Sequence, residues 1–375
     1  MEKSLIIIPT VRNAGVISDY FKNASLNKYP TNDLFFLILT EDHINKEAYR
    51  TELKENGLDG DVLNQSDRDK FMKANRIGDY IDIIPKKSHA ETSFGLIYHL
   101  FHQEFQYGFF IDDDTAPTNS SNYFGDHIKN LNFTGEIEST SSNNGWVNVL
   151  YQTYKQHKLY PRGYPYSKMG EKISMKKTNI KIRGSVYISQ GLWTNVPDLD
   201  AIRILMDGDL NGQAKTRLTP EHYKNNFIAE RNNFITICSM NLAFRRNIIP
   251  AFYQFPMDDN PHHIGRFDDI WSGVVAKKVL DHINKYIING FPLCIHNKAP
   301  RSTFKDILAE SPGYESNEYF GESIKDIKSD STDILDITEA IAQELSNNGK
   351  TPFIKYCGNY MKRWLNVCRK VGGNI

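Results

Sequence analysis

Short apolar runs of strand length are the feature that most restricts how this chain can fold. The runs SLIII (4–8) and LFFLIL (34–39) contain no alternation of polar and apolar residues. Such unbroken runs are typical of strands that are covered on both faces in a parallel sheet. Between them, apolar side chains recur at helical spacing within residues 13–27. The chain therefore opens with a predicted βαβ unit and an α/β fold.

A third apolar run, GFFI (108–111), leads directly into Asp112, Asp113 and Asp114. Carboxylates this close repel one another, so such a cluster indicates a nearby cation. Alternate side chains of an extended segment share a face, so Asp112 and Asp114 are expected to point one way and Asp113 the other. Two carboxylates at a strand end predict a divalent metal site completed by a nucleotide diphosphate. An aspartate-rich turn is the alternative.

The remaining pattern predicts further elements of an α/β protein. Residues 43–80 are polar, with room for one helix, and residues after 115 form loops rich in glycine, proline and aromatics, typical of a sugar or acceptor subsite. Later elements are predicted as a strand at 80–84, a helix at 92–105, a strand at 236–244, a helix at 269–283, a strand at 291–297 and a helix at 331–347 that is capped by Ser331 or Asp333.

Composition excludes several classes of protein. With 375 residues and 40% hydrophobic content the chain can bury a large core, and its 45 basic residues balance 45 acidic ones. No overall field therefore attracts it to nucleic acid or to an anionic membrane. Its four cysteines, Cys238, Cys294, Cys357 and Cys368, form no C-x-x-C pair, so neither a zinc knuckle nor a disulfide framework is indicated.

The ends of the chain indicate where it works. The apolar run near the N-terminus is too short for a signal peptide, and no run reaches membrane-spanning length, which predicts a cytoplasmic protein. Residues 353–370 mix aromatics with lysine and arginine. Peripheral membrane contact is one interpretation of this segment. A helix packed on its own domain or on a partner is the other.

Four further residues are candidates for chemistry. Asp268 and Asp269 lie where a loop enters a helix, so they are either helix caps or a general base and a charge stabiliser. His296 ends the last predicted strand, as a structural histidine or as a third metal ligand beside Asp112 and Asp114. Arg162 lies in a turn, and a phosphate clamp is its default role. As a nucleophile, Arg162 would need a base to remove its proton.

Together these residues identify a family that the chain resembles. Over about residues 4–300, its motifs come in the order of the reversibly glycosylated polypeptides, or UDP-arabinopyranose mutases. The matching motifs are IIIPTVR (6–12), FFIDDD (109–114), YPRGYPYS (160–167), ISQGLWTNVPDLDA (188–201), CSMNLAFRR (238–246), IGRFDDIWSG (264–273) and HNKA (296–299). The chain departs from the family at Thr92-Ser93, where typical members carry an arginine and a cysteine.

The resemblance implies a GT-A-like (Rossmann-like) mixed sheet flanked by helices, with a C-terminal helical extension. It also implies a UDP-sugar substrate, a manganese or magnesium ion held at Asp112 to Asp114, reversible glycosylation of Arg162, and a homo- or hetero-oligomer. The nucleotide contacts that we predict are Thr10, Arg12, Asp42, Asp112, Asp113, Gly191, Trp193 and Asn241.

These expectations define domains and three hypotheses. Residues 1–304 form the predicted nucleotide-sugar domain, with a nucleotide and metal half (1–115) and a sugar or acceptor half (116–304), and residues 305–375 form the helical extension. The first hypothesis is a UDP-sugar mutase that interconverts pyranose and furanose forms. The second is a glycosyltransferase that acts on a separate glycan or protein acceptor. The third is a non-catalytic partner subunit that binds nucleotide sugar.

Overall fold

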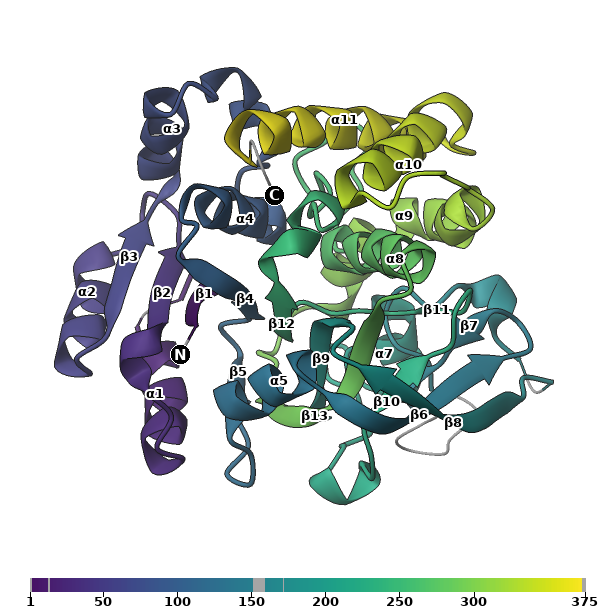
Figure 1. The fold of residues 1–375 in the computed structure, drawn as a ribbon, viewed down its shortest axis with the longest axis horizontal. Coiled ribbons are helices and arrows are strands. Elements are labelled where there is room, and N and C mark those ends of the chain that lie inside the picture. The colour runs from purple at the N-terminus through teal and green to yellow at the C-terminus, as the bar shows by residue number, and fades with distance from the viewer. Residues whose placement is uncertain (1, 13, 151–158, 171, 373–375) are drawn as a thin grey trace.

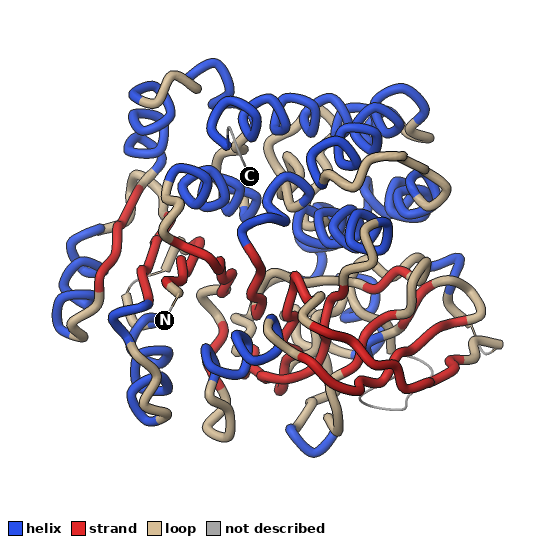
Figure 2. The backbone as a smooth tube through the Cα atoms, in the orientation of Figure 1, coloured by secondary structure: helices blue, strands red, loops and turns tan. Residues whose placement is uncertain are grey.

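Strands from both halves of the chain join one large mixed sheet (Figures 1 and 2). The computed structural model describes residues 2–12, 14–150, 159–170 and 172–372. In spatial order the strands are β3 (Asp59–Leu63), β2 (Leu34–Leu39), β1 (Lys3–Pro9), β4 (Phe105–Ile111), β12 (Asn241–Arg245), β9 (Val186–Asn195), β13 (Tyr286–His296), β10 (Phe227–Ala229), β6 (Thr134–Ser142) and β8 (Met175–Arg183). The short strand β5 (Thr115–Pro117) also pairs with β13, and β7 (Trp146–Val147) pairs with β11 (Phe234–Ile235) in a separate sheet.

The first strands confirm the predicted parallel, doubly covered sheet. Strand β1 pairs in parallel with β2 on one side and with β4 on the other. Its side chains alternate between two cores, with Leu5 and Ile7 in one and Ile6 and Ile8 in the other, and all four are buried. Because both faces of the strand are apolar and covered, its sequence shows no alternation.

Helices form a layer on each face of the sheet (Figure 1). On the face that holds Ile6 and Ile8 lie α1 (Val16–Leu26), α2 (Lys46–Glu55) and α5 (Tyr123–Leu131). The core of the opposite face includes side chains of α3 (Gln65–Ala74), α4 (Thr92–Phe101), α7 (Ala201–Asp207), α8 (Asp268–His282), α9 (Thr303–Ile324), α10 (Ile334–Asn348) and α11 (Pro352–Gly372). This arrangement confirms the α/β fold class that the sequence predicted.

Three strands end at the same edge of the sheet and thereby position the site. Strand β12 is antiparallel to both β4 and β9, so β4 and β9 run in the same direction. Strand β13 is parallel to β9, with His296 opposite Asn195. The carboxyl ends of β4, β9 and β13 therefore lie together, which is where open α/β sheets bind ligands.

Several predicted elements differ from the structure. The predicted strand at 80–84 is wrong, because Gly78–Ile83 is a 3₁₀ helix packed on α3 and α11. A run of five residues is too short for its periodicity to separate a strand from a helical turn. The predicted strand at 236–244 begins only at Asn241, and the last strand begins at Tyr286, earlier than expected. The helix predicted at 92–105 ends at Phe101, and β3 was not predicted within the polar segment.

The C-terminal helices pack on the same core as the sheet. Asp333, one of the two predicted caps, accepts hydrogen bonds from the backbone N–H groups of Leu335 and Asp336 at the start of α10. The apolar face of α11 is buried, and its Trp364 donates a hydrogen bond to the Pro250 carbonyl group. The second interpretation of this segment, a helix packed on its own domain, therefore describes its apolar face.

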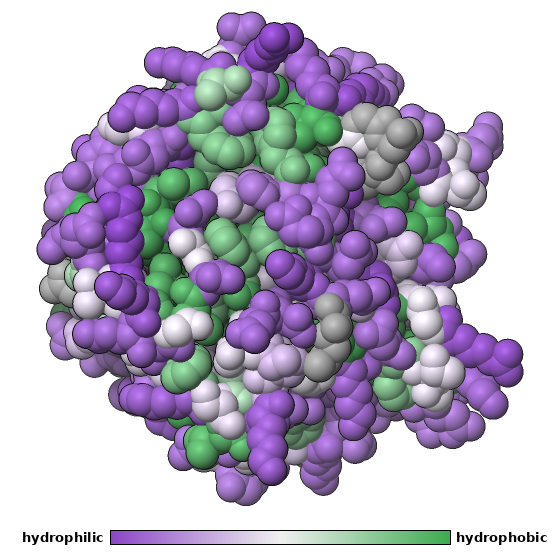
Figure 3. Space-filling view, turned by 60° about the vertical axis from the view of Figure 1, so that its left-hand side comes forward, coloured by the Kyte–Doolittle hydropathy of each residue, from purple (hydrophilic) through white to green (hydrophobic). Residues whose placement is uncertain are grey.

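The outer surface in view is mainly hydrophilic. Figure 3 shows one face of the molecule, on which hydrophilic residues cover most of the surface and hydrophobic residues form smaller patches. Among the described residues, no helix is both long enough and apolar enough to span a membrane.

Candidate functional site

A cavity of about 180 Å³ opens at the sheet edge where β4 and β13 end. It brings together all the residues that the sequence nominated for catalysis and for metal binding. The residues that line it are His89, Asp112, Asp114, Arg162, Asp198, Met240, Arg266, Asp268, Asp269, His296, Lys298 and Arg301. The cavity is thus built almost entirely from charged and polar side chains, with carboxylates and cations facing the same space.

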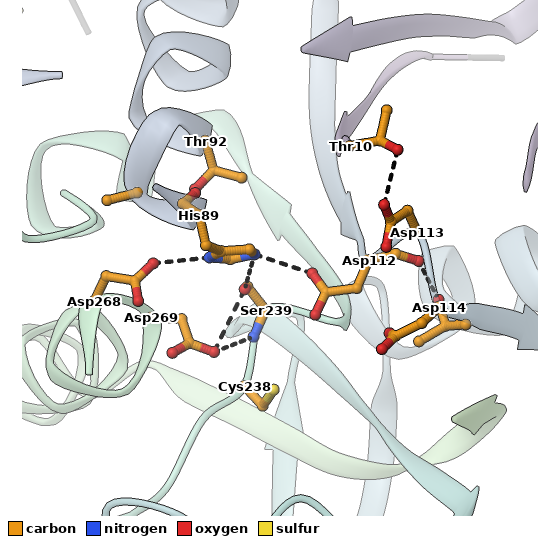
Figure 4. Close-up of polar contacts among 12 residues, drawn as sticks. Thr10, His89, Thr92, Asp112, Asp113, Asp114, Cys238, Ser239, Asp268 and Asp269 are labelled. Atoms are coloured by element: carbon orange, nitrogen blue, oxygen red, sulfur yellow. Dashed lines mark hydrogen bonds and ion pairs between the residues drawn. The ribbon is translucent and has the colours of Figure 1, made fainter. Parts of the chain in front are cut away.

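The three aspartates after β4 divide between the cavity and the chain behind it (Figure 4). Asp112 and Asp114 line the cavity, whereas Asp113 accepts a hydrogen bond of 2.8 Å from the Thr10 hydroxyl group. The Arg12 Nε atom lies 3.1 Å from Asp113 Oδ1, and Arg12 Nη2 lies 3.7 Å from Asp114 Oδ2. Asp112 and Asp114 thus face the cavity and Asp113 does not, as predicted. The backbone is not extended, however, because Asp113 and Asp114 lie in a turn in which the Thr115 N–H group donates to the Asp112 carbonyl group at 3.1 Å, so the alternative of an aspartate-rich turn describes the chain here. Thr10 and Arg12 therefore contact the aspartate cluster itself.

His89 joins the two acidic motifs of the sequence (Figure 4). Its Nε2 atom lies 3.0 Å from Asp112 Oδ1, and its Nδ1 atom lies 2.7 Å from Asp268 Oδ2. Burial works to lower the pKa of His89, but the charges of Asp112 and Asp268 outweigh it and raise the pKa well above its ordinary value. The imidazolium ion therefore donates to both carboxylates. For Asp112, burial raises the carboxyl pKa despite this neighbour.

His89 was not predicted from the sequence, because its place depends on contacts that are distant along the chain. The preceding Ser88 donates a hydrogen bond of 2.8 Å to Asp258. Two residues after His89, Glu91 forms a buried ion pair of 2.8 Å with Arg68. These contacts hold a short 3₁₀ turn against the cavity. No local sequence motif marks His89 as a residue of the site.

Arg162 is enclosed by carboxylates. Its Nε atom lies 3.2 Å from both oxygens of Asp198. Its two terminal nitrogens lie 3.1 Å from the two oxygens of Asp269, and one of them also donates to the Arg266 carbonyl group. The Arg162 backbone N–H donates to the Asp198 carbonyl group at 2.9 Å. The guanidinium group is thus held in a fixed plane by two opposed ion pairs.

This pairing sets the protonation of the cluster. Burial works to lower the pKa of Arg162, but Asp198 and Asp269 outweigh it and raise that pKa well above its ordinary value. Burial works to raise the pKa of Asp198, and the Arg162 charge overcomes it, which lowers the pKa to about 2. Asp198 was not nominated from the sequence, although it lies within the motif ISQGLWTNVPDLDA. Arg162 is therefore a cation whose donors are already engaged.

The predicted metal ligands suit a hard divalent cation. His296 Nδ1 lies 2.7 Å from the Val196 carbonyl oxygen, to which it donates, so Nε2 is the ring nitrogen that remains for a metal ion. That Nε2 atom lies 3.6 Å from Asp114 Oδ2. Asp112, Asp114 and His296 would supply two carboxylates and one imidazole, a donor set that manganese or magnesium accepts. Within the described ranges, no three acidic, histidine or cysteine side chains are already drawn into a metal-binding group.

Three cations of the cavity lining, Arg266, Lys298 and Arg301, form its basic wall. Arg266 Nε lies 2.5 Å from Glu310 Oε1, and Arg301 Nε lies 2.7 Å from Asp306 Oδ2. Burial, followed by the charges of Arg266 and Arg301, lowers the pKa of Lys298 to about 8. These residues were not nominated from the sequence, although Lys298 belongs to the HNKA motif.

Of the eight predicted nucleotide contacts, only Asp112 lines this cavity. Thr10, Arg12 and Asp113 contact one another behind it, and the other four lie elsewhere. Asp42 is exposed, and its two oxygens accept hydrogen bonds of 3.0 Å from the backbone and hydroxyl groups of Ser66. Gly191, Trp193 and Asn241 are buried in the sheet. A Cβ atom on Gly191 would lie 2.2 Å from the Asn241 amide nitrogen, so glycine here allows close packing of neighbouring strands.

Comparison with known proteins decides the family. The family model described as "Reversibly glycosylated polypeptide" matches residues 13–373. The chain belongs to this family. The resemblance that its motifs suggested is thereby confirmed over nearly the whole chain.

Curated relatives are plant proteins. UDP-arabinopyranose mutase 1 of Arabidopsis thaliana is 29% identical over 300 residues, which cover 78% of this chain and 70% of that protein. Probable UDP-arabinopyranose mutase 2 of Solanum tuberosum is 26% identical over 373 residues, which cover 96% of this chain and 88% of that protein.

Solved structures show only distant likeness. The S. aureus TarS 1-349 structure in complex with UDP-GlcNAc has a TM-score of 0.34 and 11% identity, covering 98% of this chain and 72% of that chain. The mannosyltransferase PcManGT from Pyrobaculum calidifontis, in complex with GDP-Man and Mn2+, has a TM-score of 0.37 and 12% identity, covering 96% of this chain and 85% of that chain.

Proposed function

We propose that this protein is a metal-dependent UDP-sugar mutase that interconverts pyranose and furanose forms of its substrate. UDP-arabinopyranose is the first sugar to test, because curated relatives carry its name. The observation that carries the proposal is the cavity, in which Arg162, the two acidic motifs and His296 face one space. A family member that keeps these groups together has the parts needed for the family's chemistry.

The acidic wall would hold the metal. Asp112, Asp114 and His296 are the proposed ligands, and a bound manganese or magnesium ion would supply Lewis-acid stabilisation of the departing diphosphate. Asp113 lies behind them and fixes the loop through Thr10 and Arg12. Since His89 bridges Asp112 and Asp268, it holds the first acidic motif against the second.

The covalent step would use Arg162. The bond between sugar C1 and the diphosphate oxygen breaks with its electrons on UDP, a C1–N bond forms at Arg162, and the guanidinium proton passes to Asp198 or Asp269. The ring then opens and closes through another hydroxyl group. Attack by UDP restores the arginine and its proton. Both carboxylates lie within 3.2 Å of guanidinium nitrogens, so the proton has an acceptor at hand.

One observation favours a second function. The pKa of Arg162 is raised, and its N–H groups already donate to Asp198 and Asp269. Both features are typical of an arginine that stabilises the site by its charge and forms no covalent bond. In that case the same site would transfer the sugar to a separate glycan or protein acceptor, with Asp268 or Asp269 activating the acceptor hydroxyl group.

One experiment separates these functions. The protein is incubated with UDP-arabinopyranose and Mn²⁺, and the products are analysed by nucleotide-sugar chromatography and by intact mass. A UDP-furanose peak with a glycosyl adduct that is absent from Arg162→Lys supports the mutase. Turnover that requires an added acceptor supports the transferase. Metal-dependent UDP binding without turnover of any UDP-sugar supports the non-catalytic subunit, and full turnover after chelation contradicts the metal role.

A further inference from the structure

The segment after β13 supplies Lys298 and Arg301 to the basic wall and is bonded to the aspartate cluster after β4. The Asn297 backbone N–H donates a hydrogen bond of 2.7 Å to the Asp114 carbonyl group. The Lys298 carbonyl group accepts a hydrogen bond of 2.9 Å from the Gln213 side chain. Backbone contacts therefore fix the position of Lys298 near Asp114, and its side chain lines the cavity together with Asp112 and Asp114.

The basic wall carries one more cation than its own carboxylates neutralise. Arg266 pairs with Glu310, and Arg301 pairs with Asp306, which also lies 4.0 Å from Arg266. Glu310 and Asp306 thus neutralise the charges of the two arginines. Within the part of the chain that the structure describes, the Lys298 ammonium group has no hydrogen bond or ion pair of its own.

The remaining nearby carboxylate is already committed. Asp198 also lines the cavity, but both of its oxygens are bonded to Arg162. Lys298 is only partly exposed, so water solvates its charge less completely than that of a surface lysine. A half-buried cation that faces a cavity without a partner is stabilised by an anionic ligand.

We infer that Lys298, supported by Arg301, is an anion subsite that binds the diphosphate of a nucleoside diphosphate directly. This inference rests on the proposed function for the identity of the nucleotide. Two positive groups would then neutralise the diphosphate, a metal ion held by the aspartates and the ammonium group of Lys298. Part of the nucleotide affinity is then independent of the metal, since Lys298 provides its charge without one.

The test measures binding and requires no turnover. The full chain and its Lys298→Met variant are titrated by calorimetry with UDP, inorganic pyrophosphate and uridine, each with excess EDTA. Lys305→Met is the matched control, because Lys305 is exposed on the first turn of α9 and does not line the cavity. Lys298→Arg keeps the charge, and circular dichroism checks that all variants are folded.

We expect Lys298→Met to weaken UDP and pyrophosphate about tenfold or more, the effect of losing one charged hydrogen bond. The affinity of Lys298→Met for uridine should stay within about threefold of the parent value. The affinities of Lys305→Met and Lys298→Arg for UDP and pyrophosphate should stay within the same range. Unchanged UDP and pyrophosphate affinity in Lys298→Met would overturn the inference, as would equal losses in Lys298→Met and Lys305→Met.

The inference and the proposed function fail separately. A parent protein that binds UDP through Lys298 but converts no sugar would refute the mutase and retain the subsite. A parent that binds pyrophosphate but not UDP would retain the anion subsite and refute its assignment to a nucleotide. A parent that binds neither anion would refute the subsite.

Discussion

The two carboxylate clusters of the cavity differ in how fully the protein neutralises them. Asp198 and Asp269 surround Arg162, and their side chains are 8% and 4% exposed. Asp112 and Asp114 are 25% and 19% exposed and have longer or fewer contacts with cations. The first cluster is closed and complete, whereas the second is open to a ligand. Aspartate thus has two roles in this cavity. In the closed cluster it fixes Arg162, and in the open cluster it is available to a cation.

The largest effect should come from breaking the closed cluster. Arg162→Met leaves two buried carboxylates unpaired and should lower the free energy of unfolding by about 3–5 kcal/mol. Urea denaturation followed by circular dichroism measures this loss. Arg50→Met is the control, because Arg50 pairs with Glu47 on an exposed helix face and should cost less than about 1 kcal/mol. Equal losses in the two variants would show that the cluster is not closed.

The open cluster should respond in metal affinity. Asp114→Asn should weaken Mn²⁺ binding by at least about tenfold, because it removes a charged ligand. Asp269→Asn should leave Mn²⁺ affinity within about threefold of the parent, since Asp269 is bonded to Arg162. Titration followed by electron paramagnetic resonance measures both variants. If Asp269→Asn loses as much Mn²⁺ affinity as Asp114→Asn, the two clusters do not differ in metal binding.

Acid should open the closed cluster. The folded-state pKa of Asp198 is about 2, below its ordinary value of 3.8, so its contribution to stability is present above that value and is lost as the pH falls toward 2. The parent should therefore lose about 2 kcal/mol more stability than Asp198→Asn between about pH 5 and about pH 2. Denaturation curves across this range supply the comparison. Parallel losses in the two proteins would contradict the low pKa.

The smallest effect belongs to the rim of the open cluster. Arg12 is 39% exposed and pairs with Asp113 at 3.1 Å, so Arg12→Met should cost less than about 1 kcal/mol of stability. High salt should reduce even this difference, because exposed charges are screened. Thermal denaturation at low and high salt measures it. A larger loss of stability that persists at high salt would show that Arg12 is as fully shielded from solvent as Arg162 in the closed cluster.

Local patterns predicted the strand ends well. The run GFFI followed by three aspartates was enough to predict a buried strand and the division of Asp112 and Asp114 from Asp113, and the cavity lies at the strand end where the metal site was predicted. The strand depends on residues adjacent in the chain, whereas the turn at Asp113 and Asp114 also has contacts with the distant residues Thr10 and Arg12. Arg162 was a candidate from its place in a turn, and the family resemblance then added its reversible glycosylation as a prediction.

Short or isolated signals were less informative. Residues 80–84 had the composition of a strand but form a 3₁₀ turn, because packing against α3 and α11 decides their conformation. His89 had no recognisable pattern, since it is positioned by the buried pair of Arg68 and Glu91. Neither result could be obtained without knowing which distant elements meet.

The amino-acid sequence by itself determined the α/β class, the parallel opening strands, the family and the acidic residues at the strand ends, because each depends on composition, periodicity or contiguous motifs. Only the tertiary structure decided that Arg162 is closed between Asp198 and Asp269, that His89 bridges the two acidic motifs, and that Lys298 lacks a partner. Those are relations between residues far apart in the chain, and charge neutralisation depends on distance in space, which sequence spacing does not specify.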